Sequence, residues 1–193
     1  MTVLYLVRHG QSDWNAANRF QGHVDRPLTD LGREQADALA RELAATALER
    51  IYSSPLRRAL DTATAVAAGR ELEVVADEGL REVDVGSWAG LTRAEVEERY
   101  PAAFRRWVAG GDGWADGETY QEMSARVLTC IVRIADAHED GAILVVSHGG
   151  PIRAIQAAAA GMTVHELRRD SPVEPNARLI RVGVESGRIA RLD

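Results

Sequence analysis

The sequence predicts an α/β fold, a three-layer α/β/α sandwich built around a mostly parallel central sheet. Short apolar runs rich in β-branched residues alternate with longer stretches of helical periodicity, and this alternation is typical of parallel sheets. The apolar runs are continuous, which indicates strands covered on both faces. With 193 residues, 46% of them hydrophobic, the chain has the size and apolar content of one domain.

The predicted elements alternate along the chain. Strands are expected at the apolar runs bounded by turn residues: 3–7, 51–52, 72–75, 142–146 and 179–184. Helices are expected where apolar residues recur every three or four positions: 29–45, 56–68, 92–100, 119–137 and 151–160. Thr92 with Glu95 and Thr119 with Glu122 form capping-box patterns, so these helix starts are the best defined. Cys130 lies on an apolar helix face and is expected to be buried packing.

Residues 86–117 are expected to form a cap-like helical insertion within a single domain that spans 1–193. The segment carries several glycines, and its large aromatic side chains include Trp88, Tyr100, Trp107 and Trp114. This composition favours an insertion folded over the edge of the sheet, above the active site. No role is assigned to the tail after about residue 169.

Charge and composition restrict the class of partner. A net charge of −6 argues against a nucleic-acid-binding surface, so a small-molecule partner is expected. All 23 basic residues are arginine, which excludes mechanisms that need a lysine, such as Walker A nucleotidases. No apolar run reaches the roughly 18 residues of a membrane span, and no signal peptide is recognised. A cytoplasmic location without a membrane partner is therefore expected, and a homo-oligomer is compatible with the composition.

Two histidines occupy the same kind of position. His9 follows the first strand in Arg-His-Gly, and His148 follows the fourth in Ser-His-Gly-Gly. Ligands of open α/β sheets bind beyond the carboxyl ends of strands, and a following glycine lets backbone amides approach a ligand. A single histidine would more often be structural, but two in one context favour a functional pair. His23, His138 and His165 lack this context and are expected to be structural or exposed.

Arginines at two strand ends indicate a phosphate site. Arg8 precedes His9, and Arg57 and Arg58 follow the second strand. The guanidinium fork matches phosphate geometry with two parallel hydrogen bonds. Because adjacent helical residues point about 100° apart, only one of Arg57 and Arg58 can face the pocket.

An acid is expected after the third strand. Glu82 and Asp84 lie in the alternating segment 80–86. Cleavage of a phosphoester needs an acid that protonates the departing oxygen, and either carboxyl could serve. A solvated strand edge explains this segment equally well.

Taken together, the motifs resemble the histidine phosphatase superfamily, the phosphoglycerate-mutase-like proteins. The resembling segments occur in family order: 8–15, 19–22, 25–29, 32–36, 53–63, 80–90 and 146–150. They cover the chain from residue 3 to about 153. An Arg-His-Gly triplet alone is weak evidence, but an ordered set of motifs is strong evidence.

The resemblance implies roles for individual residues. His9 matches the histidine that becomes phosphorylated, and Glu82 matches the proton donor. The remaining members of the phosphate pocket are Arg8, Arg58 and His148, the last in its protonated form. The implied substrate-binding residues are Ser12, Asn15, Gln21, Gly22 and Gly149, of which Gly149 contributes its backbone amide.

The implied reaction is hydrolysis of a small-molecule phosphomonoester through a phosphohistidine on His9. The expected partner is thus a small phosphorylated metabolite. Because arginine side chains supply the positive charge, no cofactor and no metal ion are expected.

Several alternatives remain open. A cofactor-dependent phosphoglycerate mutase is disfavoured by chain length and by the acids of 86–120, which would repel a bisphosphate: Glu95, Glu97, Glu98, Asp112, Asp116 and Glu118. A non-catalytic phosphate-binding module would keep the pocket without turnover. A metal-dependent hydrolase would need short-range ligand spacing that this sequence lacks. A serine hydrolase is disfavoured because Ser87 is the second residue of Gly-Ser-Trp-Ala-Gly, whereas the nucleophile elbow requires the third.

Overall fold

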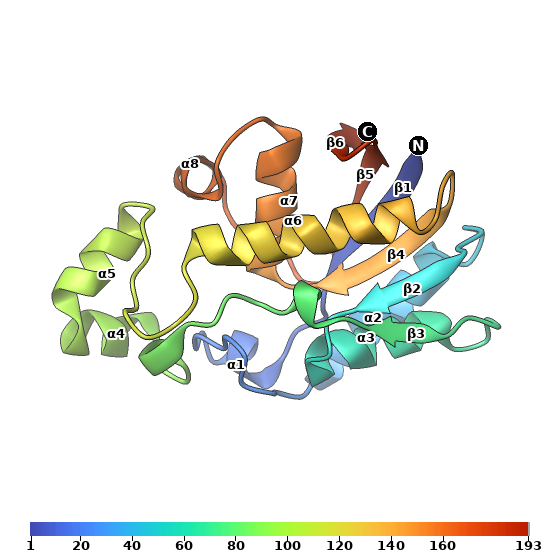
Figure 1. The fold of residues 1–193 in the computed structure, drawn as a ribbon. Helices are drawn as coiled ribbons and strands as arrows, with labels where there is room; N and C mark the ends of the chain where they lie inside the picture. The colour runs from blue at the N-terminus through green and yellow to red at the C-terminus, as the bar shows by residue number, and fades with distance from the viewer. Residues whose placement is uncertain (193) are drawn as a thin grey trace.

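A computed structural model describes residues 1–192, which form a six-stranded sheet flanked by helices (Figure 1). The strand order is β3-β2-β4-β1-β5-β6. The strands are β1 (Thr2–Arg8), β2 (Arg50–Ser53), β3 (Val74–Ala76), β4 (Ala142–Ser147), β5 (Leu179–Glu185) and β6 (Arg188–Leu192). The first four are parallel, as predicted, and β5 and β6 add an antiparallel hairpin at one edge.

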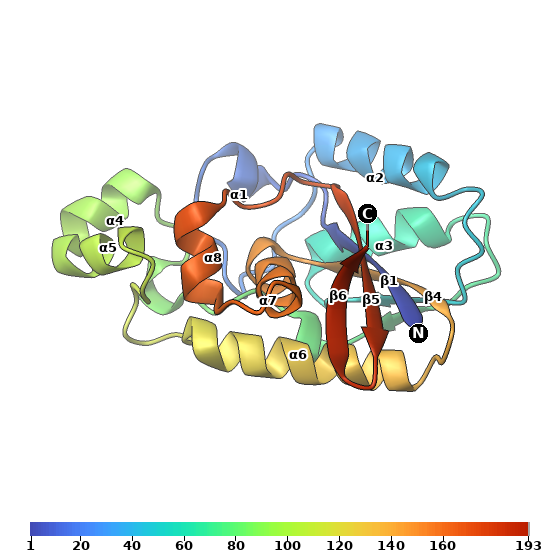
Figure 2. The same cartoon turned by 90° about the horizontal axis from the view of Figure 1, so that it is seen from above.

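Helices on both faces of the sheet complete the three layers (Figure 2). One face is covered by α2 (Asp30–Glu42) and α3 (Arg57–Ala67), the other by α6 (Tyr120–Asp136) and α7 (Gly149–Ala159). The shorter helices are α1 (Asp13–Ala16), α4 (Arg93–Arg99), α5 (Pro101–Val108) and α8 (Val164–Asp170). Within residues 1–192, no helix combines the length and apolarity needed to cross a membrane.

The pairing of β1 with β4 determines where the site lies. The two strands are parallel, with Val7 opposite Val146 and Arg8 opposite Ser147. The next residue of each strand is a histidine, so His9 and His148 leave the sheet side by side at its carboxyl edge. The two histidines predicted at strand ends are therefore neighbours in the structure.

The central strands β1 and β4 bury both of their faces, as their continuous apolar runs predict. In β1, Leu4 and Leu6 pack into the core beneath α6 and α7, whereas Val7 packs into the core beneath α2 and α3. Successive side chains of a strand point to opposite faces, so one strand contributes to both cores. Cys130 is buried on α6, as expected.

The observed element ends differ from the predicted ones for local reasons. The helix expected at 92–100 ends at Arg99, and α5 begins at Pro101. Proline suits the first turn of a helix but disfavours helical geometry in the residue before it, so the chain breaks there. The four-residue α1 and seven-residue α8 were not predicted, because they are too short to show periodicity.

Aromatic side chains hold the insertion against the rest of the fold. Trp88 is 1% exposed and packs edge-on against Phe20, Trp107 and Trp114, with ring centroids 5.2, 6.0 and 5.5 Å away. A Cβ on Gly113 would collide with the Trp88 ring, so only glycine fits beside it. This cluster positions α4 and α5 beyond the carboxyl ends of the strands (Figure 1).

Trp88→Ala should lower the free energy of unfolding by about 3–5 kcal/mol, because it leaves a cavity at the centre of this aromatic cluster. Urea unfolding followed by circular dichroism measures the change. Val108→Ala is the matched control, since Val108 is 64% exposed and its truncation should change stability by less than about 0.5 kcal/mol. Equal losses in the two variants would contradict the packing role of Trp88.

Candidate active site

The candidate site is a cavity of about 1050 Å³ beyond the carboxyl ends of β1 and β4. Eight predicted site residues line it: Arg8, His9, Asn15, Gln21, Gly22, Arg58, Glu82 and Gly149. His148 and Ser12 do not line it, although both are buried directly behind residues that do. The fold thus assembles most of the predicted set around one opening.

The geometry of His9 leaves one ring nitrogen available for attack. Nδ1 donates to the carbonyl of Gly10 at 2.7 Å, so the ring proton is on Nδ1. Nε2 accepts from Nε of Arg58 at 3.2 Å and carries the lone pair. Burial, together with the charges of Arg58 and Arg8, holds the pKa of His9 well below its usual value. His9 is therefore a neutral imidazole with its nucleophilic nitrogen beside a cation.

Arg58 is the inward member of the arginine pair. Its side chain is fully buried, whereas Arg57 is exposed, which confirms that only one faces the pocket. Two of its nitrogens donate to the carbonyls of Gly22 and Val24, each at 2.9 Å. Burial lowers the pKa of Arg58 to about 10, so it remains charged at neutral pH. The residue holds the turn at 22–24 and places a fixed cation beside His9.

Arg8 presents an unused donor in the same pocket. Its Nη1 donates to the carbonyl of Glu174 at 2.7 Å, while its buried Nε has no hydrogen-bond partner among residues 1–192. Burial lowers the pKa of Arg8 from its usual value. A buried guanidinium donor without an acceptor is costly unless a ligand supplies one. Arg8 is therefore suited to an anionic ligand.

His148 packs edge-on against His9, with ring centroids 5.0 Å apart. Its Nε2 lies 2.8 Å from the hydroxyl of Ser54, and its buried Nδ1 has no partner within the described part of the chain. Burial and the charges of Arg58 and Arg8 hold the pKa of His148 well below its usual value. The protonated form expected from the sequence is thus disfavoured in these surroundings. A neutral ring can still donate from Nδ1 when Ser54 donates to Nε2.

The structure distinguishes Glu82 from Asp84. Glu82 lines the cavity, and its Oε1 accepts from the amides of Val83 and Gly150, each at 3.0 Å. Asp84 does not line the cavity and instead accepts from the amide of Gly86. A Cβ on Gly150 would collide with Oε1 of Glu82, so glycine is required for this close approach. Glu82 is the carboxyl positioned to reach a ligand.

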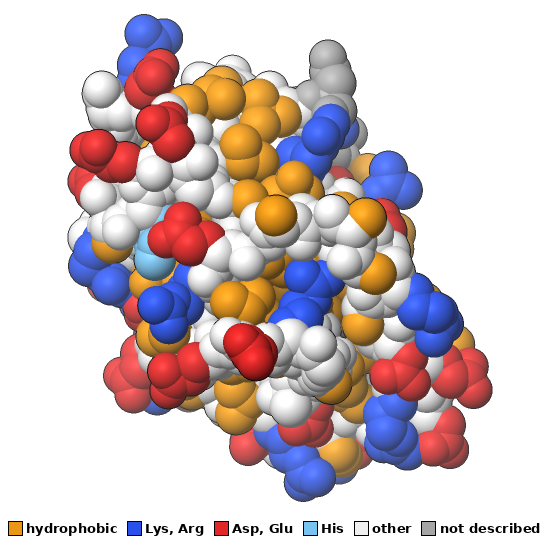
Figure 3. Space-filling view, turned by 90° about the vertical axis from the view of Figure 1, so that its right-hand side faces the viewer, with side chains coloured by type: hydrophobic (Ala, Val, Ile, Leu, Met, Phe, Trp, Pro, Cys, Tyr) orange, Lys and Arg blue, Asp and Glu red, His pale blue; other side chains and the backbone are white. Residues whose placement is uncertain are grey.

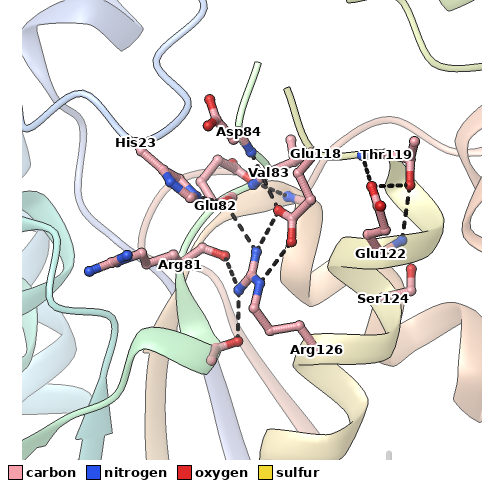
Figure 4. Close-up of polar contacts among 12 residues, drawn as sticks. His23, Arg81, Glu82, Val83, Asp84, Glu118, Thr119, Glu122, Ser124 and Arg126 are labelled. Atoms are coloured by element: carbon pink, nitrogen blue, oxygen red, sulfur yellow. Dashed lines mark hydrogen bonds and ion pairs between the residues drawn. The ribbon is translucent and has the colours of Figure 1, made fainter. Parts of the chain in front are cut away.

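Arg126 of α6 clamps the backbone that carries Glu82 (Figure 4). It donates to the carbonyls of Gly79, Arg81 and Glu82 at 3.0, 3.1 and 3.3 Å. Its guanidinium also forms a two-pronged ion pair with Glu118, at 2.8 and 2.7 Å. Because several carbonyls converge on one rigid cation, the loop before Glu82 has a defined path.

Two further residues position the site, and sequence reasoning assigned neither a functional role. His23 donates from Nε2 to the carbonyl of Glu82 at 2.7 Å. Asn176 donates to the carbonyl of His9 at 2.8 Å and to Oδ1 of Asn15 at 3.3 Å. Asn176 lies 167 residues from His9 in the chain, so no local sequence pattern connects the two residues.

Ser12 supports the substrate-facing residues from behind. Its hydroxyl donates to Oε1 of Gln21 at 2.8 Å, and it caps α1 by accepting from the amide of Asn15. Asn15, Gln21 and Gly22 all line the cavity. The predicted contact between Ser12 and substrate stays a prediction, and the structure shows Ser12 holding its neighbours in place.

The charge around the cavity corrects one sequence-based argument. The acids of 86–120 were expected to repel a highly charged substrate, yet none of them lines the cavity. Among the described residues that line the cavity, Glu82 is the only carboxylate, whereas six arginines line it: Arg8, Arg19, Arg58, Arg93, Arg153 and Arg168. Three of the six acids lie on α4, which presents only one side to the opening, and the other three lie in the loop between α5 and α6. Within residues 1–192 no cluster of three metal-ligating side chains occurs.

Stability should fall as the pH falls below about 6.5, because the unfolded chain protonates His9 and His148 there while the folded chain keeps them neutral. Each histidine should contribute up to about 1.4 kcal/mol of this loss between pH 7.5 and 5.5. Urea unfolding at the two pH values measures it. His148→Gln and His9→Gln should each show a smaller loss than the parent protein, and identical pH dependence in all three would refute the neutral pair.

The chain is similar to known proteins over most of its length. Residues 4–192 match the model of the histidine phosphatase superfamily (branch 1). Phosphoserine phosphatase 1 of Hydrogenobacter thermophilus is 39% identical over 169 residues, covering 86% of this chain and 80% of the relative.

Solved structures of other proteins also match this chain over most of its length. Bacillus stearothermophilus YhfR superimposes with a TM-score of 0.93 at 34% identity, covering 99% of this chain and 95% of the other. Mycobacterial glucosyl-3-phosphoglycerate phosphatase, solved in complex with VO3, gives 0.87 at 33% identity, covering 98% and 96%. The ordered motifs, the paired strand-end histidines and these similarities show that the chain belongs to the histidine phosphatase superfamily.

Proposed function

We propose that the protein hydrolyses small-molecule phosphomonoesters through a phosphohistidine on His9. One observation carries the proposal: the unprotonated Nε2 of a buried neutral His9 accepts from the cation Arg58, and the charge of Arg8 also acts on the ring. A nucleophile beside fixed positive charge suits attack on a phosphoryl group, since the charge stabilises the transferring oxygens. Two of the relatives named above are phosphatases by name, which supports hydrolysis.

The first half-reaction forms the phosphoenzyme. Nε2 of His9 attacks phosphorus in line, and the bond from phosphorus to the ester oxygen breaks. Glu82 enters as the carboxylic acid and gives its proton to the departing alkoxide, which leaves as the alcohol. Arg8, Arg58 and Nδ1 of His148 donate to the phosphoryl oxygens as their charge redistributes.

The second half-reaction releases phosphate. The Glu82 carboxylate accepts a proton from water, whose oxygen attacks the phosphohistidine, and the bond from phosphorus to Nε2 breaks. His9 returns to its neutral form and Glu82 to its acid form, so the cycle closes without a further reactant. The backbone amide of Gly149, in the first turn of α7, is placed to donate to the phosphate, as amides at helix N-termini do.

The substrate and setting follow from the same features. The relatives' names specify phosphoserine and glucosyl-3-phosphoglycerate, both small phosphomonoesters. A small phosphorylated metabolite is therefore the proposed partner, with no nucleic acid or membrane involved. The net charge of −6 and the lack of a spanning helix in residues 1–192 support action in the cytoplasm.

A cofactor-dependent phosphoglycerate mutase is the second candidate. Both reactions pass through a phosphohistidine and differ in whether water or another hydroxyl takes the phosphoryl group. The cationic cavity lining supports this candidate, because six arginines suit a bisphosphate. Incubation with 3-phosphoglycerate and 2,3-bisphosphoglycerate, followed for free phosphate and for 2-phosphoglycerate, separates the two. Rapid isomerisation with negligible phosphate release would establish the mutase.

Rapid acid-free quenching of the wild type with ³²P-labelled substrate should trap a base-stable, acid-labile phosphate on His9, because phosphoramidates have that stability. His9→Ala should lower turnover by at least about 10³-fold, since the nucleophile is lost. Phosphopeptide mapping locates the label. Label on a serine, or full activity in His9→Ala, would reject the nucleophile, and absence of both label and turnover would favour a binding module.

Glu82→Gln should slow alkyl phosphate esters by roughly 10²- to 10⁴-fold, because an amide cannot donate the proton that their alkoxides need. The first step with p-nitrophenyl phosphate should change far less, since p-nitrophenolate leaves unprotonated. Burst kinetics measure that step separately from phosphoenzyme hydrolysis. Asp84→Asn is the matched control and should retain activity on both esters. Equal slowing of the first step on both would point to a different role for Glu82.

A further inference from the structure

The cavity extends beyond the phosphate pocket into a cationic region that the proposed chemistry does not use. Arg93 of α4, Arg153 of α7 and Arg168 of α8 line this region, together with the rings of Trp107 and Tyr120. No ion pair within 4.0 Å joins any of these three arginines to a carboxylate among the side chains that the structure describes. The opposite end of the molecule differs, because acidic and basic side chains are interspersed there (Figure 3).

Arg168 has a structural role, because its guanidinium is already engaged by other groups of the protein. It donates to the carbonyls of Gly110 and Gly111 at 2.9 and 3.0 Å, and more weakly to that of Trp107. Its guanidinium also stacks over Tyr120, 3.9 Å from the ring centroid. These contacts tie α8 to the loop after α5, so little of this side chain remains for a ligand.

Arg93 is exposed and lies at the outer part of the cavity. Its guanidinium is 4.9 Å from the ring centroid of Trp107, and solvent can screen its charge. A cation at such a site contributes little to selective binding.

Arg153 has the features of a ligand-binding cation. It is half-buried and makes one hydrogen bond, from Nη2 to the carbonyl of Ser171 at 3.0 Å. That bond fixes the guanidinium while Nε and Nη1 donate to no acceptor in the described residues. Burial lowers its pKa although the charge of Glu82 acts in the opposite direction, so the desolvation of the charged form is offset only in part. An anionic ligand group would complete that offset.

The position of Arg153 on α7 places it near the phosphate pocket. Gly149 and Gly150 begin α7 beside Glu82, and Arg153 follows Gly149 by four residues on the same helix. Residues four apart lie on one helix face, about 6 Å apart along the axis. The charges of Arg8 and Glu82 also act on Arg153. A group bound by Arg153 would therefore lie only a few bonds from the phosphorus.

We propose that Arg153 forms a second anion subsite, which selects phosphomonoesters that carry a carboxylate a few bonds from the ester oxygen. The proposal rests on the proposed phosphatase function and adds the chemical class of its substrate. Arg153 binds the carboxylate, Arg8 and Arg58 bind the phosphoryl group, and the aromatic wall covers the carbon skeleton between them. A carboxylate suits a single partly desolvated guanidinium, because one negative charge matches one positive charge.

The test compares ligands that differ only in the carboxylate. O-phosphoserine and O-phosphoethanolamine form one pair, and 3-phosphoglycerate and glycerol 3-phosphate form a second. For the wild type, kcat/KM should favour the carboxylated member of at least one pair by roughly 10- to 100-fold, the value of a charge-assisted hydrogen bond. Arg153→Ala should bring this ratio close to one, and Arg153→Lys should restore part of it.

Control variants separate Arg153 from the other cavity cations. Arg99→Ala removes an exposed arginine of α4 outside the cavity and should keep the wild-type ratio. Arg93→Ala should also keep most of it. The proposal would be overturned if, in the wild type, kcat/KM were nearly equal for the two members of both pairs. It would also be overturned if the preference for the carboxylated member persisted in Arg153→Ala, or if it were lost in Arg93→Ala instead.

Measurements of ligand affinity distinguish a failure of the proposed subsite from a failure of the proposed function. Calorimetry on His9→Ala, with and without Arg153→Ala, measures the affinity for each member of a pair without turnover. A carboxylate preference that depends on Arg153 supports the subsite even if the wild type turns over none of the four compounds. Equal affinity within both pairs overturns the subsite even if the wild type hydrolyses p-nitrophenyl phosphate.

Discussion

The parallel pairing of β1 with β4 is the constraint on which the rest of the site depends. Because Arg8 lies opposite Ser147, the residues that follow, His9 and His148, must emerge side by side. A shift of one residue would turn every side chain of the strand to the other face and separate the two rings. The buried apolar runs on both faces oppose such a shift, so the core that stabilises the sheet also sets the geometry of the histidines.

Charge burial is the second organising feature. Arg8 and Arg58 are held in the interior by the carbonyls of Glu174, Gly22 and Val24, which are dipoles rather than counterions. The pocket is therefore pre-organised for an anion without being neutralised beforehand. Burial, together with the same cations, keeps His9 neutral, so one buried cationic arrangement both attracts the phosphoryl group and maintains the nucleophile.

The orientation of helices α4 and α5 decides which charged side chains of residues 86–120 face the cavity. Its aromatic cluster, centred on Trp88, aligns α4 and α5 so that Arg93 faces the cavity while the neighbouring acids face away. Summing charges along 86–120 ignored this orientation and suggested an acidic cover. A linear count of charges cannot predict a local field when helices present only one side to the opening.

The sequence by itself determined the order of the longer strands and helices, the buried faces of the central strands and the histidine pair, because periodicity and strand-end position are local signals. It also indicated His9, Arg58 and Glu82 through motifs that lie within single segments. Only the tertiary structure decided that Asn176 supports His9 and that Arg126 clamps the Glu82 loop. Such contacts join residues tens to more than a hundred positions apart, and no local pattern encodes which distant donor meets which carbonyl once the layers pack.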